Sequence, residues 1–198
     1  MYQTMLWGQT LCIEAEAGLF SPSHADAGTL LMASQVMLEP GQKLLDLGCG
    51  AGLVGIAAAK VLGPENVYMT DVDASAVRCA RENAARNGVA GVHIVLGDAL
   101  EAVPVADFDW ILSNPPYHAD FSVAKRFIEK GFNRLKVGGR MVMVVKRDKW
   151  YRNKLTAIFG GVRTFEADGY IVFTACKRSL SYAPKRQKPP KTPPKSAK

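Results

Sequence analysis

The residues best suited to chemistry in this sequence are Asn114, Pro115, Pro116 and Tyr117, which directly follow an apolar run at 110–113. The two prolines fix φ, so the Asn114 side chain and the Pro115 carbonyl are held in preset directions. Oxygens held in this way can each accept one hydrogen of a planar NH₂ group and stabilise the positive charge that develops as its nitrogen attacks. An aromatic ring such as Tyr117 stacks on a nucleobase with about 1–3 kcal/mol. The segment therefore predicts chemistry at an amino or amide nitrogen, the alternative being a rigid turn.

A second informative segment is the glycine-rich loop that starts at Asp46. It leaves a short apolar run and enters a helix-like stretch, and its glycines are Gly48, Gly50 and Gly52. Glycine lets a backbone turn sharply and approach a ligand closely. The spacing Gly50-x-Gly52-x-x-Gly55, with Asp71 about 20 residues on, also fits the fingerprint of a dinucleotide site. However, the carboxylate of Asp46 would repel a pyrophosphate placed on this loop.

Three aspartates, Asp46, Asp71 and Asp98, each lie at the end of a strand-like run. In a parallel sheet these ends meet at one edge, where ligands bind. S-adenosylmethionine (SAM) has no phosphate and carries a sulfonium, an α-ammonium and a ribose, all compatible with carboxylates. Asp71 would suit the ribose hydroxyls, and Asp98 the adenine amino group. The pattern favours SAM; helix-capping aspartates with turn glycines, or an NAD or FAD site, remain as alternatives.

Strand-like and helix-like segments alternate along most of the chain. The expected strands are 9–14, 44–47, 67–70, 93–96, 110–113, 141–145, 162–166 and 170–176, and the expected helices are 53–62, 74–86, 123–135 and 149–159. Such alternation is typical of a mostly parallel sheet covered on both faces. The last two strands are close enough in sequence to pair as a hairpin, which adds one antiparallel strand. We therefore predict an α/β fold.

These motifs resemble those of the class I SAM-dependent methyltransferases. Asp46-x-Gly48-x-Gly50-x-Gly52 is similar to their first motif, Asp71 to the acid that closes their second strand, and Gly97-Asp98-Ala99 to their adenine-side motif. The resemblance implies a Rossmann-like fold with a mostly parallel seven-stranded sheet, an antiparallel C-terminal hairpin strand and helices on both faces. It implies that SAM is bound by Asp46, Gly48, Gly50, Gly52, Asp71, Val72, Asp98, Ala99, Asn114 and Thr29.

Within that class the sequence most resembles the small-domain methyltransferases that modify guanine N2 in ribosomal RNA. The resemblance is carried by Gly18-Leu19-Phe20-Ser21, Asp26-x-Gly28-Thr29-x-Leu31, Asn114-Pro115-Pro116-Tyr117 and Gly169-Tyr170. It implies that the N-terminal segment folds over the cofactor, with Phe20, Asp26, Gly28 and Thr29 lining the cleft. Asn114, Pro115 and Tyr117 would be catalytic, and Phe20, Pro116 and Tyr117 would contact substrate.

The resemblance implies SAM-dependent methylation of the exocyclic N2 amine of a guanine in ribosomal RNA, of the 16S type in the small subunit. Three alternatives remain open: adenine-N6 methylation of RNA or DNA, glutamine-N5 methylation of a release factor, and an RNA-binding module of the same fold without catalysis. Some members of the family carry a further N-terminal methyltransferase-like domain, which we do not expect here. RNA docking should then use other surfaces.

The net charge of +7 is concentrated at the C-terminus. From Lys177 onward there are eight Lys or Arg and no acid, whereas the residues before it carry 17 basic and 18 acidic side chains. Residues 179–198 are rich in Pro and Lys and have few apolar side chains, so we expect a disordered basic tail. Residues 1–178 would form the methyltransferase domain, with 1–40 as the segment that covers cofactor and substrate. A basic tail favours a nucleic-acid partner, the alternative being an extension that only adds solubility.

A further candidate for RNA docking is the segment 146–154, where Lys and Arg alternate with aromatic residues. It follows an expected strand at the active-site edge, so Lys146 and Arg147 are predicted to contact substrate. The alternative is a solvated helix face with Trp150 or Tyr151 in the core. No run of apolar residues is long enough for a membrane span, and the N-terminus lacks a basic start. We expect a cytoplasmic protein without a metal site, and the sequence carries no sign of its oligomeric state.

Overall fold

The computed structural model describes residues 1–19, 21–98, 100–101, 103–115 and 121–183. Within these residues, one mixed sheet has the strand order β5-β4-β3-β6-β7-β9-β8. Its strands are β3 (Leu44–Leu47), β4 (Val67–Asp71), β5 (His93–Leu96), β6 (Phe108–Ser113), β7 (Leu135–Val145), β8 (Arg163–Ala167) and β9 (Tyr170–Cys176). Strand β9 is antiparallel to both of its neighbours, while β3 to β7 pair in parallel. The predicted fold class is confirmed.

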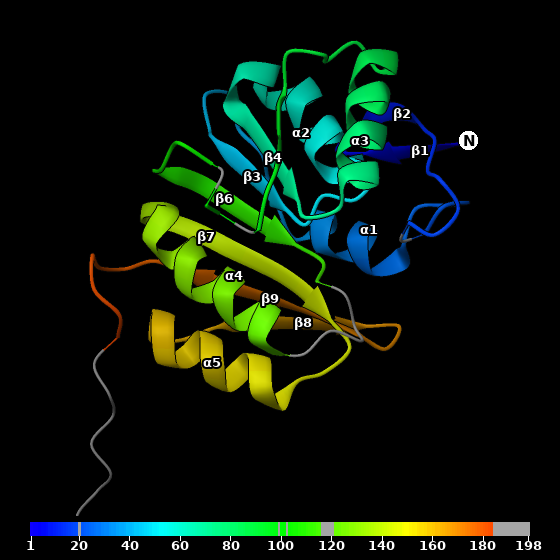
Figure 1. The fold of residues 1–198 in the computed structure, drawn as a ribbon. Coiled ribbons are helices and arrows are strands. Elements are labelled where there is room, and N and C mark those ends of the chain that lie inside the picture. The colour runs from blue at the N-terminus through cyan, green and yellow to red at the C-terminus, as the bar shows by residue number, and fades with distance from the viewer. Residues whose placement is uncertain (20, 99, 102, 116–120, 184–198) are drawn as a thin grey trace, which may run out of the picture.

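Helices cover both faces of this sheet (Figure 1). One face carries α1 (Ala27–Ser34), α2 (Leu53–Leu62) and α3 (Ala74–Arg86), and the other carries α4 (Phe121–Arg134) and α5 (Lys149–Phe159). Side chains alternate along a strand, so Leu44 packs toward the first layer and Leu45 and Leu47 toward the second. A short 3-10 turn, η1 (Pro64–Asn66), leads into β4. Burial on both sides is the reason these strands are continuous apolar runs.

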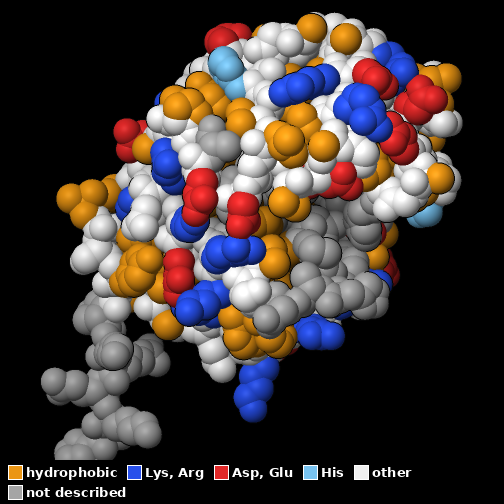
Figure 2. Space-filling view, viewed as in Figure 1, with side chains coloured by type: hydrophobic (Ala, Val, Ile, Leu, Met, Phe, Trp, Pro, Cys, Tyr) orange, Lys and Arg blue, Asp and Glu red, His pale blue; other side chains and the backbone are white. Residues whose placement is uncertain are grey.

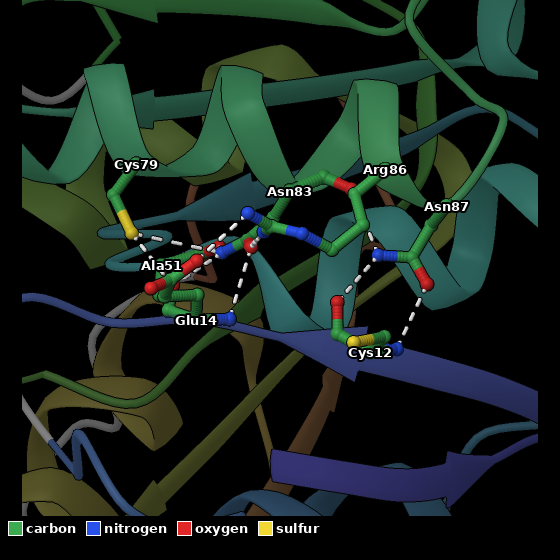
Figure 3. A network of polar contacts seen from close by, with 7 residues as sticks. All are labelled: Cys12, Glu14, Ala51, Cys79, Asn83, Arg86 and Asn87. Atoms are coloured by element: carbon green, nitrogen blue, oxygen red, sulfur yellow. Dashed lines mark hydrogen bonds and ion pairs between the residues drawn. The ribbon is translucent and has the colours of Figure 1, made fainter. Parts of the chain in front are cut away.

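A separate two-stranded hairpin of β1 (Tyr2–Leu6) and β2 (Gln9–Ile13) lies against α3 (Figure 3). Two asparagines, Asn83 in α3 and Asn87 at its C-terminal cap, bind the backbone of the segment 12–14 as a neighbouring strand would. Asn87 accepts from the Cys12 amide at 2.9 Å and donates to its carbonyl at 2.8 Å. Asn83 accepts from the Glu14 amide at 3.0 Å and donates to its carbonyl at 2.7 Å. Asn83 also donates to the Ala51 carbonyl at 2.9 Å, which ties the hairpin to the glycine-rich loop.

Most of the predicted elements are present, several with the predicted bounds, but three features differ. Strand β1 and helix α1 were not predicted, and β7 starts at Leu135 instead of 141. Gly138 and Gly139 lie within the part of β7 that was not predicted. In the structure they pair with the end of β9, because the Gly138 amide donates to the Lys177 carbonyl at 2.7 Å and the Lys177 amide to Gly139 at 2.9 Å.

The first residues of the predicted C-terminal tail lie against the domain. The Ala183 amide donates to the Ile158 carbonyl at 3.0 Å, and the Tyr182 ring meets Phe132 edge-on with centroids 4.9 Å apart. The remainder of the predicted tail, 184–198, lies outside the described residues. No helix in the described ranges has the length and apolar character that a bilayer crossing requires.

Candidate cofactor and substrate site

A cavity of about 470 Å³ opens at the carboxyl ends of β3, β4 and β6. Its walls come from the glycine-rich loop, from α1 and α4, and from the N-terminal segment around Leu19. Among the described residues, the charged members of its lining are Asp26, Asp46, Asp71, Asp73, Asp98 and Arg126. Five carboxyl groups against one guanidinium make the lining suited to a cation and unsuited to a pyrophosphate.

The glycine-rich loop is held to the neighbouring strand by its backbone. The amides of Gly48 and Cys49 both donate to the Thr70 carbonyl, at 2.9 and 3.0 Å. Gly48 and Gly50 line the cavity with φ of 77° and 53°, a region that favours glycine. Gly52 also has a positive φ of 92° but does not line the cavity; a Cβ there would lie 2.8 Å from the Met69 side chain. Gly52 thus lets α2 pack closely on β4, and its predicted contact with the cofactor stays a prediction.

Asp46 is the buried acid of the cavity, with 4% of its surface exposed. Its Oδ2 accepts from the Gly55 amide in the first turn of α2 at 2.9 Å. Burial raises the pKa of this carboxyl to about 7; the Gly55 amide opposes this rise, and the nearby charge of Asp71 adds to it. A cation in the cavity would favour the ionised form of Asp46.

Asp71 ends β4, where local backbone amides bind its carboxylate. Its Oδ2 accepts from the Gly50 amide at 2.9 Å, and its Oδ1 accepts from the Asp73 amide at 3.0 Å. Each oxygen keeps a further lone pair for a hydroxyl donor. Val72 beside it lines the cavity with 73% of its surface exposed. Asp71 can therefore make polar contacts, and Val72 an apolar contact, with the same ligand.

Asp98 lies at the far side of the cavity and forms an ion pair with Arg126 of α4, at 2.7 Å. The sequence analysis missed Arg126 and its neighbour Phe127, which also lines the cavity. Nothing in the sequence could have found them, because α4 starts after the segment 116–120 and the ion pair joins residues 28 positions apart. The pairing occupies Oδ2 of Asp98 and leaves Oδ1 available to a donor.

Asn114 follows β6 and is held through its amide nitrogen. Nδ2 donates to Oδ2 of Asp26 and to Oγ1 of Thr29, both at 3.0 Å. Its Oδ1 is buried and has no hydrogen-bond partner among the residues that the structure describes. A buried acceptor without a donor costs about 1–3 kcal/mol, so this atom is a position where a ligand would contribute a hydrogen-bond donor.

The structure thus brings together predicted residues from five segments of the chain. Those that line one cavity are Thr29, Asp46, Gly48, Gly50, Asp71, Val72, Asp98 and Asn114. Pro115 is buried next to them. The predicted residues Phe20, Ala99, Pro116 and Tyr117 lie outside the described residues.

Lys146 and Arg147 do not line the cavity, but they lie on rings close to it. The Lys146 ammonium is 4.8 Å from the Tyr170 ring centroid, and the Arg147 guanidinium is 5.6 Å from that of Phe121. Both cations are exposed. The Phe121 ring stacks on Trp150 with centroids 4.5 Å apart. An exposed arginine over a stacked aromatic pair is a surface suited to RNA.

The rest of the segment 146–154 fits the alternative of a solvated helix with an aromatic in the core. Tyr151 is buried. Arg152 pairs with Asp148 at 2.8 Å, and Lys154 pairs with Glu129. The face in Figure 2 likewise carries Lys and Arg beside Asp and Glu, without one continuous basic patch. Only the start of the segment keeps the character predicted for RNA docking.

Comparison with known proteins decides the family. A family model described as "Methyltransferase small domain" matches residues 10–174, which is most of the chain. The chain belongs to this family. The predicted resemblance is thereby confirmed. Within the small-domain family, the chain is 33% identical over 165 residues to a protein of Pseudomonas putida (strain W619) named ribosomal RNA small subunit methyltransferase C. It is 32% identical over 163 residues to the protein of that name in Pseudomonas aeruginosa (strain LESB58).

These matches cover 81% and 80% of this chain but only 49% and 48% of the relatives. The chain therefore spans about half the length of the curated relatives it matches. A solved structure of the T. thermophilus 16S rRNA N2 methyltransferase RsmC, in complex with AdoMet and guanosine, has a TM-score of 0.80 at 25% identity. The similarity covers 89% of this chain and 50% of that one. TrmN from Thermus thermophilus is similar with a TM-score of 0.65 at 26% identity, over 76% of this chain and 48% of TrmN.

Proposed function

We propose that this chain is a SAM-dependent methyltransferase that acts on the exocyclic N2 amine of a guanine in small-subunit, 16S-type ribosomal RNA. Residues 1–178 would form the catalytic domain, with 1–40 covering cofactor and substrate, and the basic residues that follow would contact RNA. The relatives named ribosomal RNA small subunit methyltransferase C and the RsmC structure with guanosine support this substrate. A ribosomal RNA substrate in turn supports a cytoplasmic location.

The observation that carries the proposal is the Oδ1 atom of Asn114. It is a buried acceptor without a partner among the described residues, and it belongs to a side chain of the acid-lined cavity. An NH₂ group is the donor that such an atom lacks. An acceptor at a fixed position is also what an amine needs when its nitrogen becomes positively charged during attack.

The residues of the chain can be assigned to two tasks in this reaction. Asn114 Oδ1 and the Pro115 carbonyl would each accept one amine hydrogen, so that the nitrogen lone pair points away from both. Tyr117, Pro116 and Phe20 would contact the base, with the Tyr117 ring stacked on it. A strong base is not required, because the nitrogen becomes acidic only after it has attacked, and in-line placement supplies most of the rate enhancement.

Asp46, Asp71 and Asp98 would hold the cofactor. SAM, when bound, supplies an electrophilic methyl group on a sulfonium. The cavity fits its charge because, in the part of the lining that the structure describes, there are five carboxyl groups and one guanidinium. Asp71 would bind the ribose hydroxyls and Asp98 the adenine amino group, with Val72 against the adenine ring. Asp46 would balance the positive charge of the methionine portion.

RNA would be held by exposed cations outside the cavity. Lys146 and Arg147 lie beside rings near its edge. The cations beyond 183 are Lys185, Arg186, Lys188, Lys191, Lys195 and Lys198. Because the part of the chain before Lys177 has 17 basic and 18 acidic residues, this tail would supply the main excess of positive charge for phosphates.

The proposal is tested by incubating the full chain with methyl-labelled SAM and, separately, naked 16S rRNA, small subunits, tRNA and a release factor. Digestion and mass spectrometry of the nucleosides should find labelled N2-methylguanosine in the ribosomal RNA. Label in N6-methyladenosine, or in a glutamine of the release factor, would replace the proposed substrate with one of the alternatives. SAM binding without transfer to any acceptor would favour a binding module.

A further inference from the structure

The two ends of the Asn114 carboxamide have nearly the same shape but opposite hydrogen-bonding character. If the proposed function is right, the oxygen has to face the substrate amine, since the NH₂ end would offer hydrogens to hydrogens. A terminal sp³–sp² torsion is broad and roughly two-fold, so rotamer preference alone does not decide which end faces the amine. Something in the surroundings of Asn114 has to choose.

Both partners of Asn114 Nδ2 are acceptors. Asp26 Oδ2 and Thr29 Oγ1 lie 3.0 Å from it, so each takes one of the two amide hydrogens. Thr29 Oγ1 donates its own proton to Asp26 Oδ2 at 3.2 Å, which leaves its lone pairs for Asn114. If the carboxamide were turned over, Oδ1 would face the carboxylate oxygen of Asp26 and a lone pair of Thr29 Oγ1. Neither group could donate a hydrogen to it.

Asp26 is itself fixed in this acceptor role. Its Oδ2 caps α1 by accepting from the Thr29 amide at 2.8 Å, and its Oδ1 accepts from the Tyr170 hydroxyl at 3.2 Å. Both oxygens of the carboxylate are therefore occupied by donors. The Tyr170 ring comes close only because residue 28 is glycine: a Cβ there would lie 2.6 Å from two ring carbons.

We propose that Asp26 is a positioning residue for the methyl transfer: its carboxylate, with Thr29, holds Nδ2 of Asn114 and thereby directs Oδ1 toward the substrate amine. The three segments involved are the start of α1, the end of β6 and the start of β9. The N-terminal segment therefore has a task beyond covering the cavity, since it selects the orientation of the group that accepts the amine. The negative charge of Asp26 also polarises the carboxamide so that its oxygen is a better acceptor.

The test separates this task from helix capping and from cofactor binding. Asp26→Asn keeps the size of the side chain and a good N-cap, but it removes the charge and introduces a donor, so both orientations of Asn114 become possible. We expect kcat to fall about 10- to 100-fold, while the Kd for SAM, measured by calorimetry, changes less than about threefold. Asp168→Asn, an exposed change in the turn before Tyr170, is the matched control and should leave kcat unchanged.

Thr29 provides a conservative rescue. Thr29→Val removes the hydroxyl at constant shape and should lower kcat about tenfold, whereas Thr29→Ser keeps the acceptor and should restore most of it. Wild-type kcat in Asp26→Asn, or a loss of SAM affinity as large as the loss of kcat, would overturn the proposal. Equal kcat for Thr29→Val and Thr29→Ser would contradict the part assigned to Thr29.

A second readout does not depend on the proposed reaction. In nuclear magnetic resonance spectra of the full chain, both side-chain amide protons of Asn114 should exchange slowly with solvent, and Asp26→Asn should speed their exchange. If the wild-type chain methylates none of the acceptors, the proposed function fails while slow exchange still supports the orientation. Fast exchange in an active wild-type chain would refute the orientation and leave the function standing.

Discussion

The acid-lined side of the cavity and the side around Asn114 are built in different ways. Asp46 and Asp71 are bound by backbone amides only 2 to 21 positions away in the sequence. Asn114 depends on Asp26 and Thr29, which are 88 and 85 positions away, and Asp26 on Tyr170, which is 144 positions away. The first side is a local structure of loop and strand ends, whereas the second exists only when three remote segments meet.

The two sides should therefore respond differently to substitution. A change on the acid-lined side should alter cofactor affinity, because the acids would hold the cofactor. A change around Asn114 should alter turnover, because that side would orient the amine. Mutations, a pH series and a truncation can each test this separation.

The largest effect is expected from Asn114→Ala. The change removes the oxygen proposed to accept an amine hydrogen, so kcat should fall about 10²- to 10³-fold, as when one electrostatic stabiliser is lost from an active site. The Kd for SAM by calorimetry should stay within a few-fold. Asn133→Ala, on the exposed side of α4, is the control. A parallel loss of affinity and turnover would mean that the two sides are not separate.

Asn83→Ala should destabilise the fold and loosen the cofactor loop. Asn83 is fully buried and bonds the Glu14 backbone and the Ala51 carbonyl, so its loss should lower the free energy of unfolding by about 1–3 kcal/mol. Asn87→Ala is the matched change, because Asn87 binds the hairpin in the same way but is only half-buried and does not reach Ala51. Urea unfolding of both variants should give the smaller loss for Asn87. Equal losses of unfolding free energy in the two variants would mean that the hydrogen bond from Asn83 to Ala51 does not stabilise the fold.

The pH dependence of SAM binding probes Asp46. Burial raises the pKa of its carboxyl to about 7, and a cationic ligand favours the ionised form, so binding should strengthen as the pH rises through 7. The Kd should be about tenfold larger at pH 6 than at pH 8. Without ligand the sign is opposite for the fold, because ionising a buried acid lowers stability between about pH 4 and 7. Asp46→Asn should flatten both profiles; a Kd in that variant that still changes tenfold would point to another group.

The smallest effect is expected at the C-terminus. Truncation after Ala183 removes six cations and leaves the cavity intact, so the SAM Kd should be unchanged. Affinity for RNA should fall, and the slope of log K against log salt should decrease by roughly 0.7–0.9 for each phosphate that the tail no longer neutralises. Filter-binding assays at several salt concentrations measure both the RNA affinity and this slope. An unchanged slope would mean that the tail does not neutralise phosphates and that the folded domain alone binds the RNA.

Much of the fold could be predicted because its signals are local. The strand 44–47 and the helix 74–86 were predicted with the bounds that the structure shows. Helix α1 was missed because it is only eight residues long and directly follows a segment with the Gly, Ser and Pro residues of a turn. The start of β7 was missed because its two glycines signal a break, and only pairing with the residues after β9 makes them strand.

The sequence alone was sufficient for the α/β fold, the glycine loop and the acids at the strand ends, because each depends on neighbours along the chain. It also identified Asn114, whose chemistry follows from its type and the prolines beside it. Which end of that carboxamide is held, and that Arg126 meets Asp98, became known only from the three-dimensional arrangement. A hydrogen bond between residues 88 positions apart leaves no periodicity or spacing in the sequence, since its geometry exists only after the sheet has brought the segments together.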